Sequence, residues 1–214
     1  MAAAIIGSNI RLEVHSALGS PVTIVSITLA SPGVVTATAH GFTNGDVVRF
    51  SITSGMSQLD GQAVRVANKT NDTFEMEGLN TTAYEAFVAG TVTEATTFAT
   101  FAKAQAVTAP NPAPTKIDIT CLIHVVKQYA YGLPDAPDGT IGALFNPSGT
   151  TEALIAAATT ANTAMVFRIT WSDSRKTIFN ANVSGGYGWD LATNDAAKSS
   201  VAFTPVGLVM HYSS

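Results

Sequence analysis

The chain contains 214 residues, of which 46% are hydrophobic and only 12% are charged, and its formal net charge is −4. This length allows one large or two small domains. Soluble domains carry about 25% charged residues, so a surface this poor in charge predicts a protein that is largely covered, most simply by copies of itself. The 11 Lys and Arg residues are scattered along the sequence, which argues against a clustered basic surface for tight nucleic-acid binding.

Three further features of the sequence bear on the cellular location of the protein and on its covalent structure. No stretch approaches the roughly 20 continuous apolar residues of a membrane-spanning helix, so no membrane partner is expected. Cys121 is the single cysteine, which rules out an internal disulfide. The first residues, Met1 to Gly7, lack the basic region and the long apolar core of a secretion signal, which predicts synthesis in the cytoplasm.

The first part of the chain reads as a series of short strands. Residues 10–15 alternate apolar and polar side chains, the period of a half-buried strand. Asn44-Gly45 predicts a hairpin turn with positive φ at both central residues, and Asp60-Gly61 repeats the pattern. Strands at about 8–12-residue spacing predict a compact barrel or sandwich. The other strands expected here are 22–29, 34–39, 62–67, 73–77 and 87–93.

Residues 96–139 show a less regular pattern of apolar and polar side chains. Residues 96–107 are ambiguous between strand and helix, and their threonines favour a strand. The proline cluster in residues 108–115 favours an extended, exposed arm. Residues 117–121 alternate as a strand does, and residues 132–139 read as a rigid loop rich in turn residues.

The last third predicts one helix followed by a hairpin. Residues 151–161 are rich in Ala, with Ser148 or Thr150 as candidate caps and Glu152 in the first turn, where the helix dipole favours an acid. Residues 164–171 and 176–183 form a predicted hairpin around the turn 172–175, ended by residues 184–188. Residues 201–211 supply closing apolar strands.

Together these elements predict a mainly β protein built from two domains. Residues 1–21 and 95–214 would form one discontinuous domain, a β-sandwich or barrel with a single α-helix. Residues 22–94 would form a small β-barrel domain inserted into it.

No catalytic or metal-binding constellation is evident. Cys121 and His124 have the appearance of metal ligands, but nothing nearby supplies a third and fourth ligand, so Cys121 is interpreted as a core cysteine. The acids Asp135 and Asp138 lie in a Pro/Gly-rich loop where solvation is the default. No nucleophile elbow, phosphate-binding loop or EF-hand is present. We therefore expect no enzyme activity, no cofactor and no metal.

The second half resembles the tail tube protein of long, non-contractile-tailed bacteriophages. The resemblance covers roughly residues 1–20 and 95–214 and differs at residues 172–175, where the family usually has Asp-Gly. It rests on the order of Thr115-Lys-Ile-Asp-Ile-Thr120, Gly132-Leu-Pro-Asp135, the Ala-rich helix, Phe167-Arg-Ile-Thr-Trp171 and Phe179-Asn-Ala-Asn-Val183. The inserted part contains His40-Gly-Phe-x-x-Gly-Asp-Val-Val-x-Phe50, the segment from Gln62 to Val66 and Asn71-x-Thr-Phe74. With these motifs it is similar to a small β-barrel module of phage structural proteins that is named after ubiquitin-activating enzymes.

The resemblance implies a structural virion protein. Six copies would close a ring, and stacked rings would form a tube that carries DNA to the host cell without binding it specifically. Expected partners are other copies, the tail tip or initiator complex, the tape measure protein and the tail terminator. Glu13 and Asp118, each on the polar face of an alternating strand, are candidate lumen acids. Candidate contacts between rings are Pro110, Asn111, Pro112, Pro114, Leu133, Pro134 and Asp135.

The inserted domain is expected to be an outward-facing decoration, so its removal should leave thinner tubes that still form. Two other functions stay open. The aromatic residues Tyr84, Phe87 and Tyr187 suggest a module that binds a glycan or a cell surface. A tube protein of a contractile tail or of a secretion system is the second alternative.

Overall fold

The computed structural model describes residues 9–109, 114–123, 125–134, 138–146, 148–193 and 195–213. Every strand pair within these residues is antiparallel. The elements are β1 (Arg11–Leu18), β2 (Val22–Thr23), β3 (Ser26–Ile27), β4 (Val34–Thr36), β5 (Val47–Gly55), the 3₁₀-helix η1 (Ser57–Leu59), β6 (Ala63–Ala67), β7 (Thr73–Met76), β8 (Phe87–Thr100), β9 (Ala104–Thr108), β10 (Pro114–Asp118), β11 (Tyr129–Pro134), β12 (Gly139–Leu144), α1 (Thr150–Ala161), β13 (Ala164–Thr170), β14 (Lys176–Asp190) and β15 (Lys198–Tyr212).

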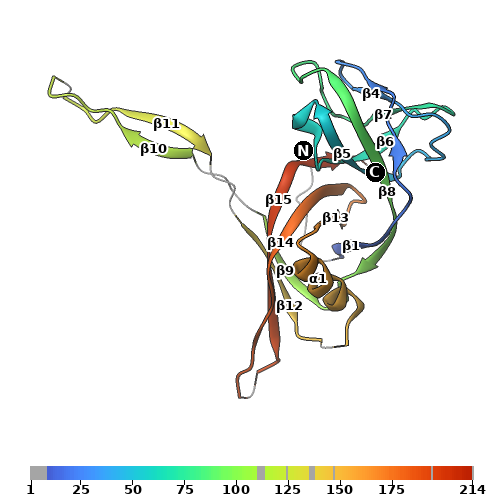
Figure 1. Cartoon of the computed structure of the whole chain (residues 1–214). Helices are drawn as coiled ribbons and strands as arrows, with labels where there is room; N and C mark the ends of the chain where they lie inside the picture. Colours follow the sequence, from blue (N-terminus) through green and yellow to red (C-terminus); the bar gives the residue numbers. More distant parts are fainter. Residues whose placement is uncertain are drawn as a thin grey trace.

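One long, curled sheet organises the molecule into a half-barrel (Figure 1). Its strands run in the order β3-β4-β7-β6-β5-β8-β1-β13-β14-β15-β12-β9, with β2 beside β8. Strands β10 and β11 form a separate two-stranded hairpin that projects away from the rest (Figure 1). The mainly β fold with one helix expected from the sequence is confirmed.

We call residues 22–94 the module and the remaining sheet with its helix the body. Strand β8 belongs to both: its first part, up to Glu94, pairs with β5, and Ala95 to Thr100 pair with β1. Strand β2 adds Val22 opposite Val92. The expected boundary between residues 94 and 95 therefore falls inside a continuous strand.

The body has its own apolar core between the sheet and α1. Three rings on neighbouring strands, Phe167, Phe179 and Phe203, stack with centroids 5.3–5.8 Å apart. The helix covers this core with Ile155 and Ala158, both buried. Burying such side chains is the main driving force for this packing, at about 1.5–3 kcal/mol each.

The helix begins as expected, with one difference at its cap. Glu152 lies in the first turn, where the carboxylate interacts favourably with the helix dipole. The N-cap residue is Gly149, and no side chain caps the helix, so neither Ser148 nor Thr150 acts as expected. Asn162 ends the helix in the left-handed conformation with φ of 49°.

The module has a second core, and a third joins it to the body. Phe50, Phe74 and Leu59 are fully buried in the module core. The third core contains Val47 and Ala63 from the module together with residues of the body. The body residues of this seam are Ala95, Val166, Ile178 and Tyr212.

Several local predictions were wrong. Asn44-Gly45 does not close a hairpin, because β4 pairs with β3 and β7 whereas β5 pairs with β6 and β8. Only Gly45 has positive φ there, and Asp46 holds the turn by accepting hydrogen bonds from the Thr43 N–H and hydroxyl. The expected strand 22–29 is split into β2 and β3, because the chain passes from pairing with β8 to pairing with β4.

Two predicted loop segments are strands. Residues 132–134 continue β11, with Pro134 opposite Pro114 at the end of the ladder, a position where a missing N–H costs little. Residues 184–188 do not end the hairpin, since β14 continues to Asp190 with a shift of register between Ser184 and Gly188. The ambiguous segment 96–107 is extended as favoured, with a break between β8 and β9.

Candidate functional surfaces

The hairpin β10–β11 forms a projecting arm, residues 114–134, whose tip is apolar. Strands β10 and β11 pair only with each other within the described chain (Figure 1). Turn tips are usually polar, but four apolar residues here are 71–107% exposed. These tip residues are Leu122, Ile123, Val125 and Val126. So much exposed apolar surface marks an interaction site.

An apolar groove opens on the body beside the edge strand β9. Its volume is about 550 Å³, within the range of about 300–1,000 Å³ typical of binding pockets. Strand β9 forms one wall, and β13, β14 and β15 form the other. The large apolar side chains that line it include Leu12, Ile169, Trp171, Phe179, Phe203 and Val209. The groove is the part of the half-barrel interior that α1 leaves unfilled.

Strand β9 also leaves one edge of the sheet open. It pairs with β12 on one side and with no other strand in the described residues. All five of its residues are exposed. An exposed edge offers backbone N–H and C=O groups to another strand, so this edge is suited to pairing between copies.

The face of the sheet opposite α1 is covered by the module at one end and uncovered elsewhere. Thr140, Ala202 and Ser184 form a row across β12, β15 and β14, and Thr108 extends the row to β9. The neighbouring positions Ser200 and Asn182 are also exposed. The side chains of this row are small and uncharged, whereas Lys198, paired with Asp195, lies on the same face at the start of β15.

Glu13 does not lie on an exposed polar face as expected. Its residue is only 4% exposed, and its carboxylate accepts a hydrogen bond of 2.7 Å from Nε of Arg168. The guanidinium of Arg168 in turn lies over the ring of Phe98, 3.9 Å from the centroid. The alternating pattern placed Glu13 on the correct side of β1, but that side is covered here. The reason for assigning it to a lumen therefore fails.

Asp118 is fully exposed at the outer end of β10, on the arm. The backbone N–H of Thr120 donates to its carboxylate at 2.9 Å, and Lys127 lies 3.9 Å away across the arm. Hydrogen bonds from Thr120 lower the pKa of Asp118 below its ordinary value, so the group is ionised at neutral pH.

The other predicted site residues cluster at the base of the arm. Pro114 begins β10 and is exposed, and Leu133 and Pro134 end β11. Pro110, Asn111, Pro112 and Asp135 lie outside the described residues. The structure thus brings the described members together at the point where the arm leaves the body.

Sequence reasoning missed the tip of the arm. It considered Cys121 and His124 as ligands or core residues, whereas Cys121 is exposed and His124 lies outside the described residues. A signal was present: an apolar run between two short strands contradicts the usual polarity of a hairpin tip.

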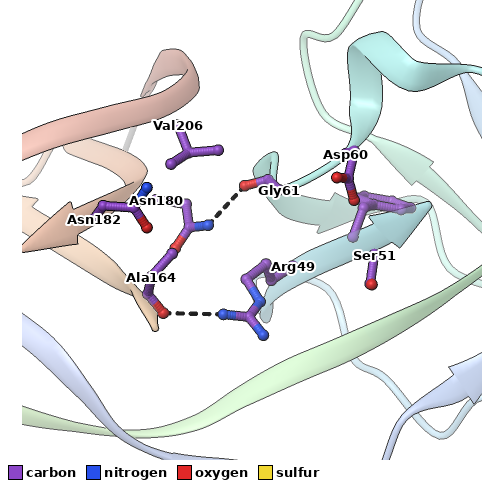
Figure 2. Close-up of a pocket in the computed structure, with 9 residues that line it drawn as sticks. Arg49, Ser51, Asp60, Gly61, Ala164, Asn180, Asn182 and Val206 are labelled. Atoms are coloured by element: carbon purple, nitrogen blue, oxygen red, sulfur yellow. Dashed lines mark hydrogen bonds between the residues drawn. The ribbon is translucent and has the colours of Figure 1, made fainter. Parts of the chain in front are cut away.

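A small polar cavity of about 200 Å³ lies in the seam between module and body (Figure 2). The guanidinium of Arg49 donates to the carbonyl of Ala164 at 3.0 Å, and the amide of Asn180 donates to the carbonyl of Gly61 at 2.8 Å. Beside this cavity His15 accepts a hydrogen bond from the N–H of Val166. Burial, followed by the charge of Arg49, lowers the pKa of His15.

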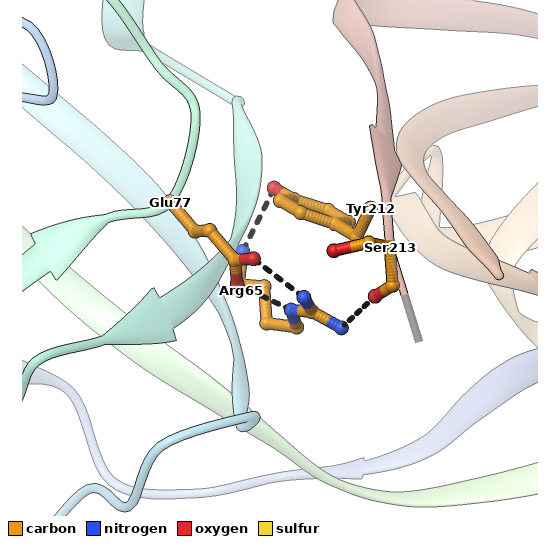
Figure 3. Close-up of polar contacts among 4 residues, drawn as sticks. All are labelled: Arg65, Glu77, Tyr212 and Ser213. Carbon is orange, nitrogen blue, oxygen red and sulfur yellow. Dashed lines mark hydrogen bonds and ion pairs between the residues drawn. The ribbon is translucent and has the colours of Figure 1, made fainter.

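The end of the chain is fastened to the module (Figure 3). Arg65 forms a two-pronged ion pair with Glu77 and donates to the carbonyl of Ser213 at 3.0 Å. The hydroxyl of Tyr212 accepts a hydrogen bond from the Arg65 N–H, and burial raises the pKa of Tyr212 to about 12. The hydrogen bonds that Arg65 donates to Glu77 raise the pKa of Arg65 above its ordinary value.

Three residues before Arg65, the side-chain amide of Gln62 accepts a hydrogen bond from the N–H of Leu208 and donates one to its carbonyl. Gly207 is required at this contact, because its φ is +79° and an added Cβ would meet the side chain of Gln62.

Three other kinds of site were considered on the described residues: metal sites, membrane-spanning helices and glycan-binding aromatics. Within the described ranges, no group of three or more His, Cys, Asp or Glu residues is arranged to hold a metal ion. None of the described helices is both long and apolar enough to cross a membrane. Of the aromatics considered for glycan binding, Tyr84 and Phe87 are partly buried and pack against the module core, and the side chain of Tyr187 lies outside the described part of the structure.

The fold and its surfaces define a structural β protein with an open sheet edge, an unfilled apolar groove and an apolar arm. Comparison with protein families agrees with this class. The family described as phage tail tube, TTP, lambda-like matches residues 77–204, more than half of the chain. The chain therefore belongs to the lambda-like phage tail tube family.

A second family, described as the FCCH domain of ubiquitin-activating enzyme E1, matches residues 30–96. This match lies within the module apart from its last two residues and indicates similarity over that part of the chain. No curated protein matches the chain.

Proposed function

We propose that copies of this chain close into rings of six and that the rings stack into a phage tail tube through which DNA passes to the host cell. Membership of a tail tube family implies self-assembly with tail proteins. The observation that carries the proposal is the set of unfilled surfaces on one chain: the β9 edge, the groove and the arm. Contacts that close within a ring but repeat between rings produce a filament.

The arm is the element suited to contacts between rings. Its base carries Pro114, Leu133 and Pro134 and its outer end carries Asp118. Burying the four tip residues would contribute about 1.5–3 kcal/mol each, which is comparable in sum to the about 4–15 kcal/mol that association costs. Because several arms would act together in each ring, the interactions add through effective concentration.

We assign the lumen to the uncovered face of β9, β12, β15 and β14. Glu13, the lumen acid expected from the sequence, is not part of this surface because it is buried. Thr140, Ser184, Ser200 and Asn182 expose hydroxyl and amide groups there without charge. Tight binding to DNA depends on Lys and Arg contacts with phosphates. Lys198, which lies on this face at the start of β15, is paired with Asp195 at 2.6 Å. A wall whose cation is neutralised in this way would let DNA slide through it.

The assembly part of the proposal is tested by electron microscopy of the purified chain over a range of concentrations, with and without the tail tip complex that starts the tube. Rings and tubes with a central channel are expected. A chain that stays monomeric throughout, or an assembly with a filled centre, contradicts the proposal. A sheath around native tails would assign the chain to the contractile type instead.

The lumen assignment is tested with Ser200→Lys particles. Tubes of normal length with slower DNA release are expected, because lysines would face the phosphates. Ala157→Lys is the matched control, since Ala157 is exposed on α1, on the opposite side of the sheet. Equal release rates for the two variants would contradict the assignment.

Expected partners in the particle are the initiator, tape measure and terminator proteins.

A further inference from the structure

The arm tip and the groove are two apolar surfaces that one chain cannot cover with each other. The tip residues Leu122, Ile123, Val125 and Val126 are almost fully exposed. The arm points away from the body that contains the groove (Figure 1). Because β10 and β11 pair with no strand of the large sheet, no backbone pairing holds the arm against its own body.

We propose that the tip of the arm of one copy inserts into the apolar groove of a second copy of this chain. The inference rests on the proposed self-assembly and names the two surfaces that meet. The groove offers Ile169, Trp171, Phe203 and Val209 to the entering side chains. Its volume of about 550 Å³ is large enough for several aliphatic side chains.

The area and the charges of the two surfaces are compatible with this contact. At about 25 cal/mol per Å², the about 1.5–3 kcal/mol of one aliphatic side chain corresponds to roughly 60–120 Å². The four tip side chains and the surface that they meet would therefore bury roughly 500–1,000 Å² in each contact, at the small end of specific interfaces. The charged groups nearest the tip, Asp118 and Lys127, lie 3.9 Å apart and balance each other. His211 is the one titratable residue among those lining the groove.

Cys121 allows a direct test, because it is the single cysteine of the sequence and is exposed beside the tip. Tubes assembled from Val209→Cys subunits are treated with a mild oxidant and analysed on denaturing gels. A ladder of disulfide-linked chains is expected, and it should disappear when Cys121→Ser is added. Val25→Cys is the control, since Val25 is 62% exposed on the module, far along the chain from both surfaces.

A second measurement uses Val125→Asp, with Val88→Asp as the matched control on the module, where Val88 is 66% exposed. Val125→Asp should raise the concentration needed for tube formation about 10- to 100-fold, the change that corresponds to one buried aliphatic side chain. Val88→Asp should leave it unchanged. Unaltered circular dichroism of both variants would show that the chain still folds.

The outcomes separate this inference from the proposed function. Wild-type chains that never assemble would overturn both. Tubes that form but give no ladder, or a ladder equally strong with Val25→Cys, would overturn the arm-to-groove contact alone. So would an Ile6→Cys/Val209→Cys pair that closes a disulfide within one Cys121→Ser chain, because the chain's own N-terminal residues would then occupy the groove.

Discussion

Removing the module is expected to destabilise the body. Thr23 and Thr91 are paired neighbours in β2 and β8, so residues 24–90 can be replaced by a two-residue Asn-Gly turn without moving either strand. The deletion uncovers the body side of the seam. Val166, Ile178 and Tyr212, now 0–4% exposed, would face water.

The size of the effect follows from this burial. Three large side chains at about 1.5–3 kcal/mol each give a loss of about 5–9 kcal/mol, an upper bound because the unfolded chain also buries apolar surface. Domains of this size are stable by about 5–15 kcal/mol. The deletion should therefore remove much of the stability of the body, which runs against a purely decorative role.

The assay is guanidinium unfolding of the full chain and the deletion variant, each with and without the pair Val166→Ala and Ile178→Ala. In the full chain this pair should cost several kcal/mol, since it empties a packed core. In the deletion variant the same pair should cost under about 1 kcal/mol, because both side chains are already exposed. An unchanged midpoint after the deletion, or equal costs of the pair in both backgrounds, would refute the reasoning.

Three further predictions concern single residues. Burial and the charge of Arg49 lower the pKa of His15 below 6.5, so the unfolded chain binds a proton at a higher pH than the folded chain does. The contribution of His15 to the free energy of unfolding is therefore fully present above pH 6.5 and is lost as the pH falls below this value. His15→Gln should flatten this part of a plot of unfolding midpoint against pH. Glu13→Gln leaves the largely buried guanidinium of Arg168 without its partner charge and should cost about 3 kcal/mol in urea unfolding. An unchanged urea midpoint would show that the ion pair adds no net stability. Gly139→Ala places a methyl group against the Phe203 ring and should lower stability by about 1–3 kcal/mol; a melting temperature unchanged from wild type would show that the ring can move.

Much of the body follows from local sequence patterns. The alternation around Phe167 and Ile169 predicted β13 and its partner, and the Ala-rich run with Glu152 predicted α1. These elements are long and have a clear periodicity, so local preference and tertiary packing agree. Trp171, the residue after β13, also packs against the body core.

The failures arose where tertiary pairing decided the outcome. Asn44-Gly45 has the composition of a hairpin turn, but β5 is paired with strands that are distant in sequence from β4. Glu13 has the correct strand parity, but the packing of Arg168 over Phe98 that covers it depends on β13 and β8. The apolar arm tip contradicts local turn chemistry, as expected if, in the proposed assembly, a second copy covers it.

The continuous strand β8 removes rotational freedom between the two parts of the molecule. A domain on a flexible linker rotates independently of its neighbour. Here, rotation of the module would have to break the hydrogen-bond ladders that β8 forms on both sides of Glu94 and Ala95. A fluorophore fixed to the module should therefore tumble at the rate of the whole assembly. In a filament, every module would keep the same orientation relative to the filament axis. The outer surface would then carry a regular lattice of identically oriented modules.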